Sequence, residues 1–422
     1  MTIRVHTLSW RMIATIGVAI VVAGQFSGWN YGLAFGWSNM VAAGLLMLVF
    51  YAGLLQCLSE LSATWPSAGG LANYSRLAYG DWAGGLLSVS MALGLIACAG
   101  AVANFIASYA ATVIGAGGLA TRIALFMGVM ALHLRGTKEA MWMVVLAGAV
   151  AIATLLGFAQ GTAVFVQTSN FELDNQALST HGVIQAIPFA LWLYLGVEQA
   201  VTASEEAANP AIDMPRGLML ALVILTVTAA GVLICAPGAG GVSVVSKAGD
   251  PLLAAILAQG SGHAVLANII GVGAIFGLLA SFFSITYSAS RQLFDLSRTG
   301  FFPKPFATVT EKGTPVAAFI AVALSGFLVS LVSPERILLA AVLLFTASYF
   351  LTALAFVRLR KTMGHVERSY RALGGLGTGI VTLGISLIIF YACLNIDWLS
   401  LALIGSTFAY VVLHRRILQR RS

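Results

Sequence analysis

Long apolar runs separated by short polar stretches dominate the chain. Most runs are about 18–25 residues long, the length with which an α-helix crosses the hydrocarbon core of a bilayer. Transmembrane β-strands would instead show about ten residues of alternating polarity. The pattern therefore predicts an all-α polytopic membrane protein with about 12 transmembrane helices. The expected spans are 11–37, 39–64, 81–112, 117–134, 139–160, 181–203, 216–237, 263–294, 314–333, 335–358, 374–393 and 397–414.

Composition agrees with a lipid environment. Of the 422 residues, 59% are hydrophobic and 9% are charged, whereas a soluble domain carries about 25% charged residues. The net charge of +7 does not indicate nucleic-acid binding, because the basic residues are not clustered on a soluble module. A soluble nucleotide-binding module is also missing, which excludes a primary ATP-driven pump for this chain alone.

The basic residues predict the topology. With a cytoplasmic N-terminus, nearly all Lys and Arg fall on the inner side, and only Arg122, Lys247 and Arg336 fall outside. The positive-inside rule selects this orientation. We therefore expect an integral protein of the cytoplasmic (inner) membrane with both termini in the cytoplasm.

Two spans contain residues that weaken a helix. The first span contains the sequence Gly24-Gln25-Phe26-Ser27-Gly28-Trp29-Asn30, and the sixth contains Leu195-Gly196-Val197-Glu198. Unwound backbone inside a membrane is tolerated only where protein encloses it. Interrupted helices at corresponding positions of two halves indicate a transporter binding site. The alternative is that small residues allow these helices to pack closely.

Three motifs resemble those of the amino acid–polyamine–organocation permeases. The first, Glu60-Leu61 through Pro66-Ser67-Ala68-Gly69-Gly70 to Tyr74, is similar to the signature after helix two of that family. The second, from Gly196-Val197-Glu198 to Pro215-Arg216-Gly217, looks like its helix-six signature. The third, Ser290-Arg291 through Arg298 to Pro303, resembles its helix-eight exit. The three occur in the family's order, so the whole chain resembles these permeases.

The resemblance implies a LeuT-type five-plus-five inverted repeat with two extra C-terminal helices. Residues 1–422 would form a single transmembrane permease domain, with the first repeat at 11–160, the second at 181–358 and the extra helices at 374–414. Its function would be secondary active transport by alternating access around a midplane site. Glu60 and Arg76, near the inner mouth, fit gate or topology charges better than substrate ligands.

Helix one departs from the family's common Gly-Ser-Gly-Ile-Phe and keeps only Ser27-Gly28. The sequence around Phe26, Gly28, Trp29 and Asn30 is similar to the ethanolamine-permease branch. Its larger residues favour a small amine or an amino alcohol such as ethanolamine, with an α-amino acid as the close rival.

The expected substrate-binding residues lie at the two interruptions. Ser27 and Gly28 would supply backbone donors, and Trp192 matches an aromatic residue of the related arginine–agmatine exchangers. Phe26, Trp29, Trp192 and Tyr194 would enclose a cationic amine by cation–π attraction. The full set is Gly24, Gln25, Phe26, Ser27, Gly28, Trp29, Asn30, Trp192, Tyr194, Leu195 and Gly196.

Glu198 is a carboxyl group within a membrane span, which is a functional hypothesis by default. Ionised, it would attract an ammonium group; protonated, it would exchange a proton when the site opens to water. Its structural alternative is a hydrogen bond between helices. The resemblance also implies a role in gating, because the corresponding glutamate of the related arginine–agmatine exchangers is tied to proton-dependent gating. We therefore expect Glu198 to act in proton coupling or gating.

The sequence predicts no metal site and no cofactor beyond the coupling ion. A proton is the favoured ion, and Na⁺ is the alternative, with the hydroxyls of Ser281 and Ser284 as candidate ligands. Expected partners are a small amine or amino acid and the lipid bilayer, without nucleic acid.

Other function classes fit the sequence less well. A membrane-embedded enzyme needs converging acids or histidines, and the six histidines are scattered over helix ends and loops. A channel needs a continuous polar lining rather than two isolated interruptions. An Na⁺-coupled or uncoupled α-amino acid permease stays open as the alternative transporter.

Overall fold

A computed structural model describes residues 7–135, 138–171, 177–310, 314–395 and 398–419. These residues are almost entirely helical, and their only β-pairing is an isolated bridge between Leu8 and Ala207. Seven helical segments are long and apolar enough to cross a membrane by length and composition, and four shorter apolar helices accompany them. The predicted class, an all-α polytopic membrane protein, is confirmed.

Every expected span coincides with helical structure. The elements that occupy the spans are α1 (Trp10–Val21) with α2 (Ala23–Phe26) and η1 (Trp29–Phe35), α3 (Trp37–Thr64), α5 (Asp81–Ile114), α6 (Gly118–Arg135), α7 (Lys138–Thr162), α8 (Thr180–Trp192) with η4 (Val197–Glu205), α9 (Pro210–Gly240), α12 (Ala264–Arg298), α13 (Val316–Val329), α14 (Pro334–Thr362), α15 (Leu376–Ala392) and α16 (Trp398–Gln419). The connecting elements are α4 (Gly70–Tyr79), η2 (Ala163–Phe165), η3 (Thr168–Phe171), α10 (Val242–Val245), α11 (Pro251–Leu257), η5 (Ser261–His263), η6 (Lys304–Ala307) and η7 (Cys393–Asn395).

Two features differ from the sequence expectation. Helix α9 begins at Pro210 rather than at 216, so the Pro215 step lies within the helix. Proline at the first helical position loses no hydrogen bond, because the first N–H groups of a helix have no partner there. Helix α4 was not expected, because ten residues of mixed polarity form no long apolar run.

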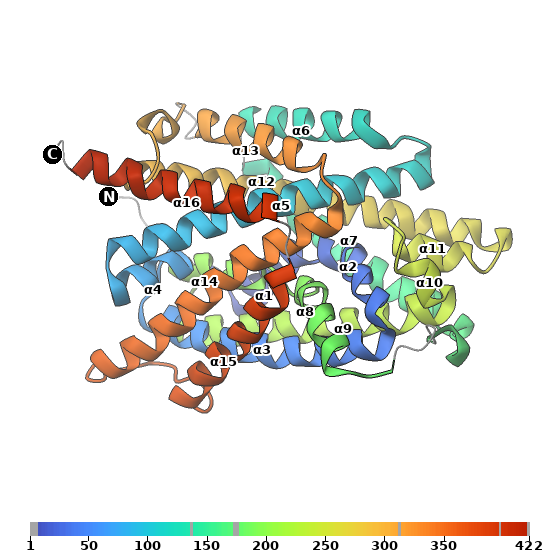
Figure 1. Cartoon of the computed structure of the whole chain (residues 1–422), viewed down its shortest axis with the longest axis horizontal. Coiled ribbons are helices and arrows are strands. Elements are labelled where there is room, and N and C mark those ends of the chain that lie inside the picture. Colours follow the sequence, from blue (N-terminus) through green and yellow to red (C-terminus); the bar gives the residue numbers. More distant parts are fainter. Residues whose placement is uncertain (1–6, 136–137, 172–176, 311–313, 396–397, 420–422) are drawn as a thin grey trace.

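The packing brings the two interrupted spans into the middle of the molecule. Helix α5 packs along both α12 and α14, while α9 packs along both α1 and α3. Figure 1 shows α6 and α13 along the upper edge, α3 and α9 along the lower edge, and α5 and α14 between them. A helix that is apolar on all sides can be buried in this way, with other helices packed against opposite faces of it.

The first and last described stretches lie at the same end of the molecule. The backbone N–H groups of Thr7 and Leu8 both donate to the Glu206 carbonyl at 3.0 Å, and Arg415 donates to the Thr299 carbonyl at 2.6 Å. Helix α4 lies at this end, and α10 and α11 lie at the opposite end (Figure 1). We call these the α4 end and the α11 end.

Candidate functional site

The first span is interrupted where its glycines and polar residues predicted. Helix α2 ends at Phe26, Ser27 is extended (φ −160°, ψ 164°), and Gly28 has φ 100° before η1 begins. Such a φ favours glycine strongly. A Cβ atom on Gly28 would also lie 2.6 Å from Nε1 of Trp192. Both the conformation and the space therefore require glycine at this position.

The sixth span is interrupted in the same manner. Helix α8 ends at Trp192, Gly196 has φ 106°, and the chain continues as the 3₁₀ helix η4 from Val197. The two interruptions face each other directly, since the indole Nε1 of Trp192 donates to the Ser27 carbonyl at 3.1 Å. The predicted breaks are confirmed, and they meet.

Aromatic side chains satisfy the carbonyl groups that the first break leaves free. The last carbonyls of a helix have no intrahelical partner, and a lipid environment offers none. Three side chains supply the missing hydrogen bonds. Trp29 Nε1 donates to Gln25 O at 3.0 Å, Tyr109 Oη donates to Phe26 O at 2.9 Å, and Trp192 Nε1 donates to Ser27 O at 3.1 Å. The surrounding fold therefore supplies the hydrogen-bond donors that the break requires.

Gln25 connects the first break with two other helices. Its Nε2 donates to the carbonyls of Leu193, beside the sixth-span break, and Leu225 on α9, at 3.2 and 2.9 Å. Its Oε1 atom is buried, and no described residue donates to it. The amide therefore fixes the relative position of the two interruptions and leaves one acceptor without a donor.

The segment before α11 covers the first break from the α11 end. Ser27 Oγ donates to the Gly249 carbonyl, and Asn30 Nδ2 donates to the carbonyls of Val245 and Ala248, all at 2.9 Å. The Gly28 N–H in turn donates to Asn30 Oδ1 at 3.0 Å. The predicted polar residues of this span therefore hold a cover in place.

Asp250 anchors that cover to α5. The Thr112 hydroxyl donates to its Oδ2 atom at 2.5 Å. Burial raises the pKa of the Asp250 carboxyl above its ordinary value, and the hydrogen bond from Thr112 acts in the opposite direction. The cover is therefore attached to α5 as well as to the first break.

A small cavity of about 20 Å³ lies between the two interruptions. Four of the predicted binding residues border it: Gly24, Trp192, Leu195 and Gly196. A space of this size holds about one water molecule. The site is therefore closed around its centre, and a larger solute requires the walls to move.

Other cavity residues were missed by the sequence interpretation. The walls that do not belong to the interrupted spans come from three helices: Leu95, Cys98 and Val102 on α5, Ile285 on α12 and Phe345 on α14. These spans are apolar on every side, so no periodicity marks the face that borders the cavity.

The other predicted aromatic residues do not border the cavity. Phe26 packs edge-on against Tyr109 with ring centroids 6.4 Å apart, and Tyr194 lies 5.5 Å from Tyr51. Trp29 is fully buried beside the first break. Of the four expected to enclose an amine, only Trp192 borders the cavity in this conformation.

Glu198 lies just beyond the cavity and is fully buried. Its carboxyl oxygens accept hydrogen bonds from the Gly196 N–H and from Gln199 Nε2, both at 3.1 Å. The Tyr349 side chain interacts with it as well, and the hydroxyls of Tyr349 and Tyr51 lie 3.3 Å apart. The carboxyl thus connects the sixth-span break with α14 and, through Tyr349, with α3.

The two candidate ion ligands differ in their contacts. Ser281 is fully buried, and its hydroxyl donates to the Ala19 carbonyl of α1 at 2.9 Å. Ser284 donates to Ala280 on its own helix, also at 2.9 Å. Only Ser281 therefore reaches the interrupted span. Within the described ranges, no three His, Cys, Asp or Glu side chains are placed to hold a metal ion.

Comparison with known proteins agrees with the three sequence motifs. The profile of the amino acid permease family matches residues 7–413, nearly the whole chain. The chain belongs to the amino acid permease family. It is thus a multi-pass integral membrane protein of the amino acid–polyamine–organocation superfamily that the three motifs indicated.

The permease is similar to several bacterial transporters. It is 25% identical to the branched-chain amino acid permease BcaP of Bacillus subtilis over 59% of this chain and 53% of that protein. It is 27% identical to an uncharacterized transporter of Rhizobium meliloti, over 84% and 79%. It is 29% identical to the methylthioribose transporter of Bacillus subtilis, over 52% and 47%. The matches to the two Bacillus subtilis proteins span about half of their length.

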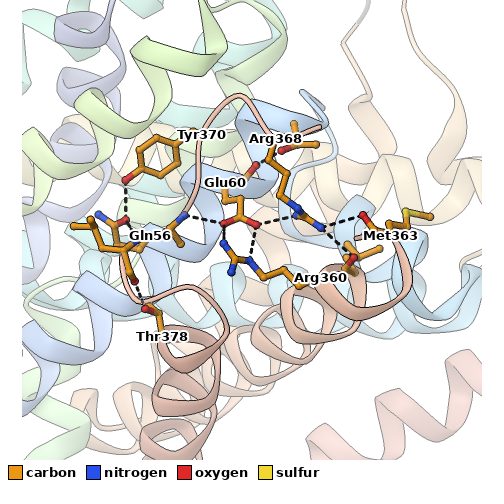
Figure 2. A network of polar contacts seen from close by, with 11 residues as sticks. Gln56, Glu60, Arg360, Met363, Arg368, Tyr370 and Thr378 are labelled. Carbon is orange, nitrogen blue, oxygen red and sulfur yellow. Dashed lines mark hydrogen bonds and ion pairs between the residues drawn. The ribbon is translucent and has the colours of Figure 1, made fainter. Parts of the chain in front are cut away.

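A second polar cluster lies at the α4 end of the permease. Glu60 of α3 is fully buried and accepts hydrogen bonds from four N–H groups (Figure 2). Arg360 of α14 donates from Nε at 2.8 Å and from Nη2 at 2.5 Å, Arg368 donates at 2.8 Å, and the Ala372 N–H donates at 2.7 Å. This Glu60 clamp joins α3 to the end of α14.

Gln56, one turn before Glu60 on α3, extends the clamp. Its Oε1 atom accepts from the Tyr370 hydroxyl at 2.7 Å and from the Leu373 N–H at 3.1 Å (Figure 2). The connection between α14 and α15 is therefore fastened along the end of α3. The gate or topology role expected for Glu60 stays a prediction, but its partners are now known.

Proposed function

We propose that the permease is a secondary transporter rather than an enzyme, and that it moves a small amine, an amino alcohol such as ethanolamine, or an amino acid. Family membership supports this proposal, as does the similarity to BcaP, a branched-chain amino acid permease. The observation that carries it is the meeting of two broken helices around a cavity, with Trp192 bonded to the Ser27 carbonyl.

Transport would proceed by alternating access. The cover at residues 245–249 closes the α11 side of the first break. On the opposite side lie Glu198 and the tyrosine pair of α3 and α14. Opening the first set of contacts while the second stays closed, and then the reverse, would expose the cavity to each side in turn. The five-plus-five inverted repeat is the architecture that this proposal assumes.

The α4 end would face the cytoplasm of an inner-membrane protein. Arg360, Arg368 and Arg415 all make their contacts at this end. The positive-inside rule places such residues on the cytoplasmic side. Both termini would then be cytoplasmic, as the distribution of basic residues in the sequence predicts.

Glu198 would couple transport to protons. It is the acid beside the sixth-span break, and in this conformation it is fully buried with its oxygens bonded to the Gly196 N–H and Gln199. When the surrounding helices separate, its carboxyl can exchange a proton with the aqueous phase, because hydration favours the charged form. Coupling to Na⁺ through Ser281 and the Ala19 carbonyl is the alternative.

Uptake into proteoliposomes tests this function. Purified permease should accumulate radiolabelled ethanolamine or leucine, with faster uptake under a pH gradient than under a Na⁺ gradient. Glu198→Gln should abolish the pH response, because the glutamine side chain has no ionisable group that could carry the proton. The matched control is Glu335→Gln, an exposed acid at the start of α14. A pH response that survives in Glu198→Gln would exclude the proton role.

A further inference from the structure

A groove lies on one side of the helix bundle, between α3, α8 and α15. Its volume is about 770 Å³, compared with about 20 Å³ for the cavity between the two breaks. The three helices pack against one another around it (Figure 1). Its walls are the start of α8, Ala42 and Leu46 on α3, and Leu387, Ile388 and Tyr391 on α15. The groove and the cavity share no lining residue, so they are separate sites.

Hydrocarbon side chains form most of the groove. Val183, Ile184 and Ile187 line it from α8, and they share a face of that helix because Ile187 lies four and three residues after the other two. Leu387 and Ile388 line it from α15. None of the described lining residues is charged. These walls therefore suit an apolar ligand.

Polar groups occur at one end of the groove. Ser179 and Thr180 lie where α8 begins, and Tyr391 lies in the last turn of α15. This is the α11 end of the molecule, since the indole of Trp37, at the start of α3, donates to the Leu233 carbonyl near the end of α9. Tyrosine is enriched where the hydrocarbon core of a bilayer meets its polar headgroups. The groove therefore runs from that boundary into the hydrocarbon core.

The open side of the groove is continuous with the lipid-facing surface of the permease. Leu45 and Val49 flank the lining residues of α3 and are exposed, as is Leu387 on α15. The bilayer core holds no water, and a cavity with apolar walls stays dry. A hydrocarbon chain is therefore the material that can fill the groove.

We propose that an acyl chain of a phospholipid, from the leaflet at the α11 end, occupies this groove as a bound lipid. Walls from three helices contact such a chain on several sides, so it gains more van der Waals contacts than a chain on a convex surface. The Ser179 hydroxyl accepts from the Gly182 N–H at 3.1 Å, and its own O–H can donate to an ester carbonyl of the lipid. The chain would support α8, the half-helix that ends at Trp192 beside the sixth-span break.

The lining favours a lipid chain over a helix from a second copy of the permease. Helices associate in membranes through small residues that allow close approach, whereas Ala42 is the only small apolar residue among the described lining residues. Along α8 the lining extends from Thr180 to Ile187, which is about 10 Å at 1.5 Å per residue. A partner helix would therefore find a short contact with branched side chains.

Photochemical labelling by lipid tests the site. Purified permease is reconstituted into liposomes that contain a phosphatidylcholine with a diazirine in one acyl chain, and the adducts formed on irradiation are mapped by mass spectrometry. Per exposed area, adducts on the groove segments of α8 and α15 should be several times as frequent as those on Leu324 and Leu328, which are exposed residues of α13 outside the groove. Equal frequencies would mean that lipid only covers the surface, and they would overturn the proposal.

A matched pair of variants locates the labelling in the groove. Leu387→Trp places a larger side chain in the lining, and Leu324→Trp makes the same change outside it; the two leucines are 56% and 62% exposed. Leu387→Trp should lower the adduct frequency on α8 several-fold, whereas Leu324→Trp should leave it unchanged. A decrease of equal size in both variants, or in neither, would contradict the assignment.

Thermal unfolding of delipidated permease in detergent gives an independent measurement. Phosphatidylcholine should raise the unfolding midpoint of the wild type and of Leu324→Trp, because a ligand bound by the folded state stabilises it. The rise should be smaller for Leu387→Trp. The midpoints without lipid check that both variants are folded. A free fatty acid of the same chain length that produces the full rise would overturn the assignment to a phospholipid.

Dilution in the membrane distinguishes the lipid from a second copy. The adduct frequency on α8 should not depend on the ratio of lipid to permease while lipid is in excess. A second copy in the groove would exclude the labelled lipid, so adducts on α8 would be rarer than on α13 and would become more frequent on dilution. That result would overturn the proposal.

Discussion

At the scale of single residues, aromatic donors hold the broken first span together. Tyr109 and Trp192 reach its free carbonyls from α5 and α8, and Trp29 reaches one from within the span. Without these donors, buried carbonyl oxygens would have no hydrogen-bond partner, which costs about 1–3 kcal/mol for each group. The break thus depends on side chains that are distant in sequence as well as on glycine.

Tyr109→Phe should therefore destabilise the permease by about 1–3 kcal/mol. The change removes only the hydroxyl, so the Phe26 carbonyl loses its donor while the ring still packs against Phe26. The measurement is the thermal unfolding midpoint in detergent.

The control for this prediction is Tyr79→Phe. The Tyr79 hydroxyl also donates to a backbone carbonyl, that of Leu354, but the bond is 3.4 Å long and the residue is 40% exposed. Water can replace that donor, so the midpoint should barely change. Equal midpoints for the Tyr109→Phe variant and the wild type would show that the hydroxyl does not support the break.

At the scale of helices, α3 and α14 are joined at two depths. The hydroxyls of Tyr51 and Tyr349 meet near the cavity, and Glu60 binds Arg360 toward the α4 end. The Tyr51–Glu60 and Tyr349–Arg360 separations along the two helices are nine and eleven residues, or roughly 14 and 17 Å of helix at 1.5 Å per residue. The pairing therefore keeps nearly the same register over that length.

Glu60→Gln should cost about 3–5 kcal/mol of stability, because it leaves two guanidinium groups without a carboxylate. The side chains of Arg360 and Arg368 are only 19% and 6% exposed, so water cannot fully compensate. Chemical or thermal unfolding of the purified variant measures the loss.

Asp81→Asn provides the comparison for the Glu60 clamp. Asp81 also pairs with two arginines, Arg76 at 3.4 Å and Arg415 at 3.9 Å, but its side chain is 66% exposed. Exposed ion pairs contribute about 0–1 kcal/mol, so this variant should stay close to the wild type. Losses of the same size in both variants would mean that burial does not strengthen the clamp.

At the scale of the whole molecule, the sequence predicted what depends on local pattern. Run length predicted the spans, and glycine with polar residues predicted the breaks at Gly28 and Gly196. The arginine partners of Glu60 could not be predicted, because they lie about 300 residues away in the chain. The cavity walls of α5 could not be predicted either, because an all-apolar helix has no distinctive face.

The native thiol of Cys98 allows a direct test of where the solute binds. Cys98 borders the cavity, whereas the buried Cys235 of α9 does not. Two variants, each retaining one of these cysteines and with alanine at the other three, would be reconstituted and labelled with a small maleimide. The labelling rate is measured with and without the best-transported amino acid or amine.

We propose that the two broken helices bind the transported solute between them. The solute should then slow labelling of Cys98, with half-protection near the concentration that half-saturates uptake, and leave labelling of Cys235 unchanged. A permease that transports the solute while Cys98 reacts at the same rate with and without it would contradict this claim.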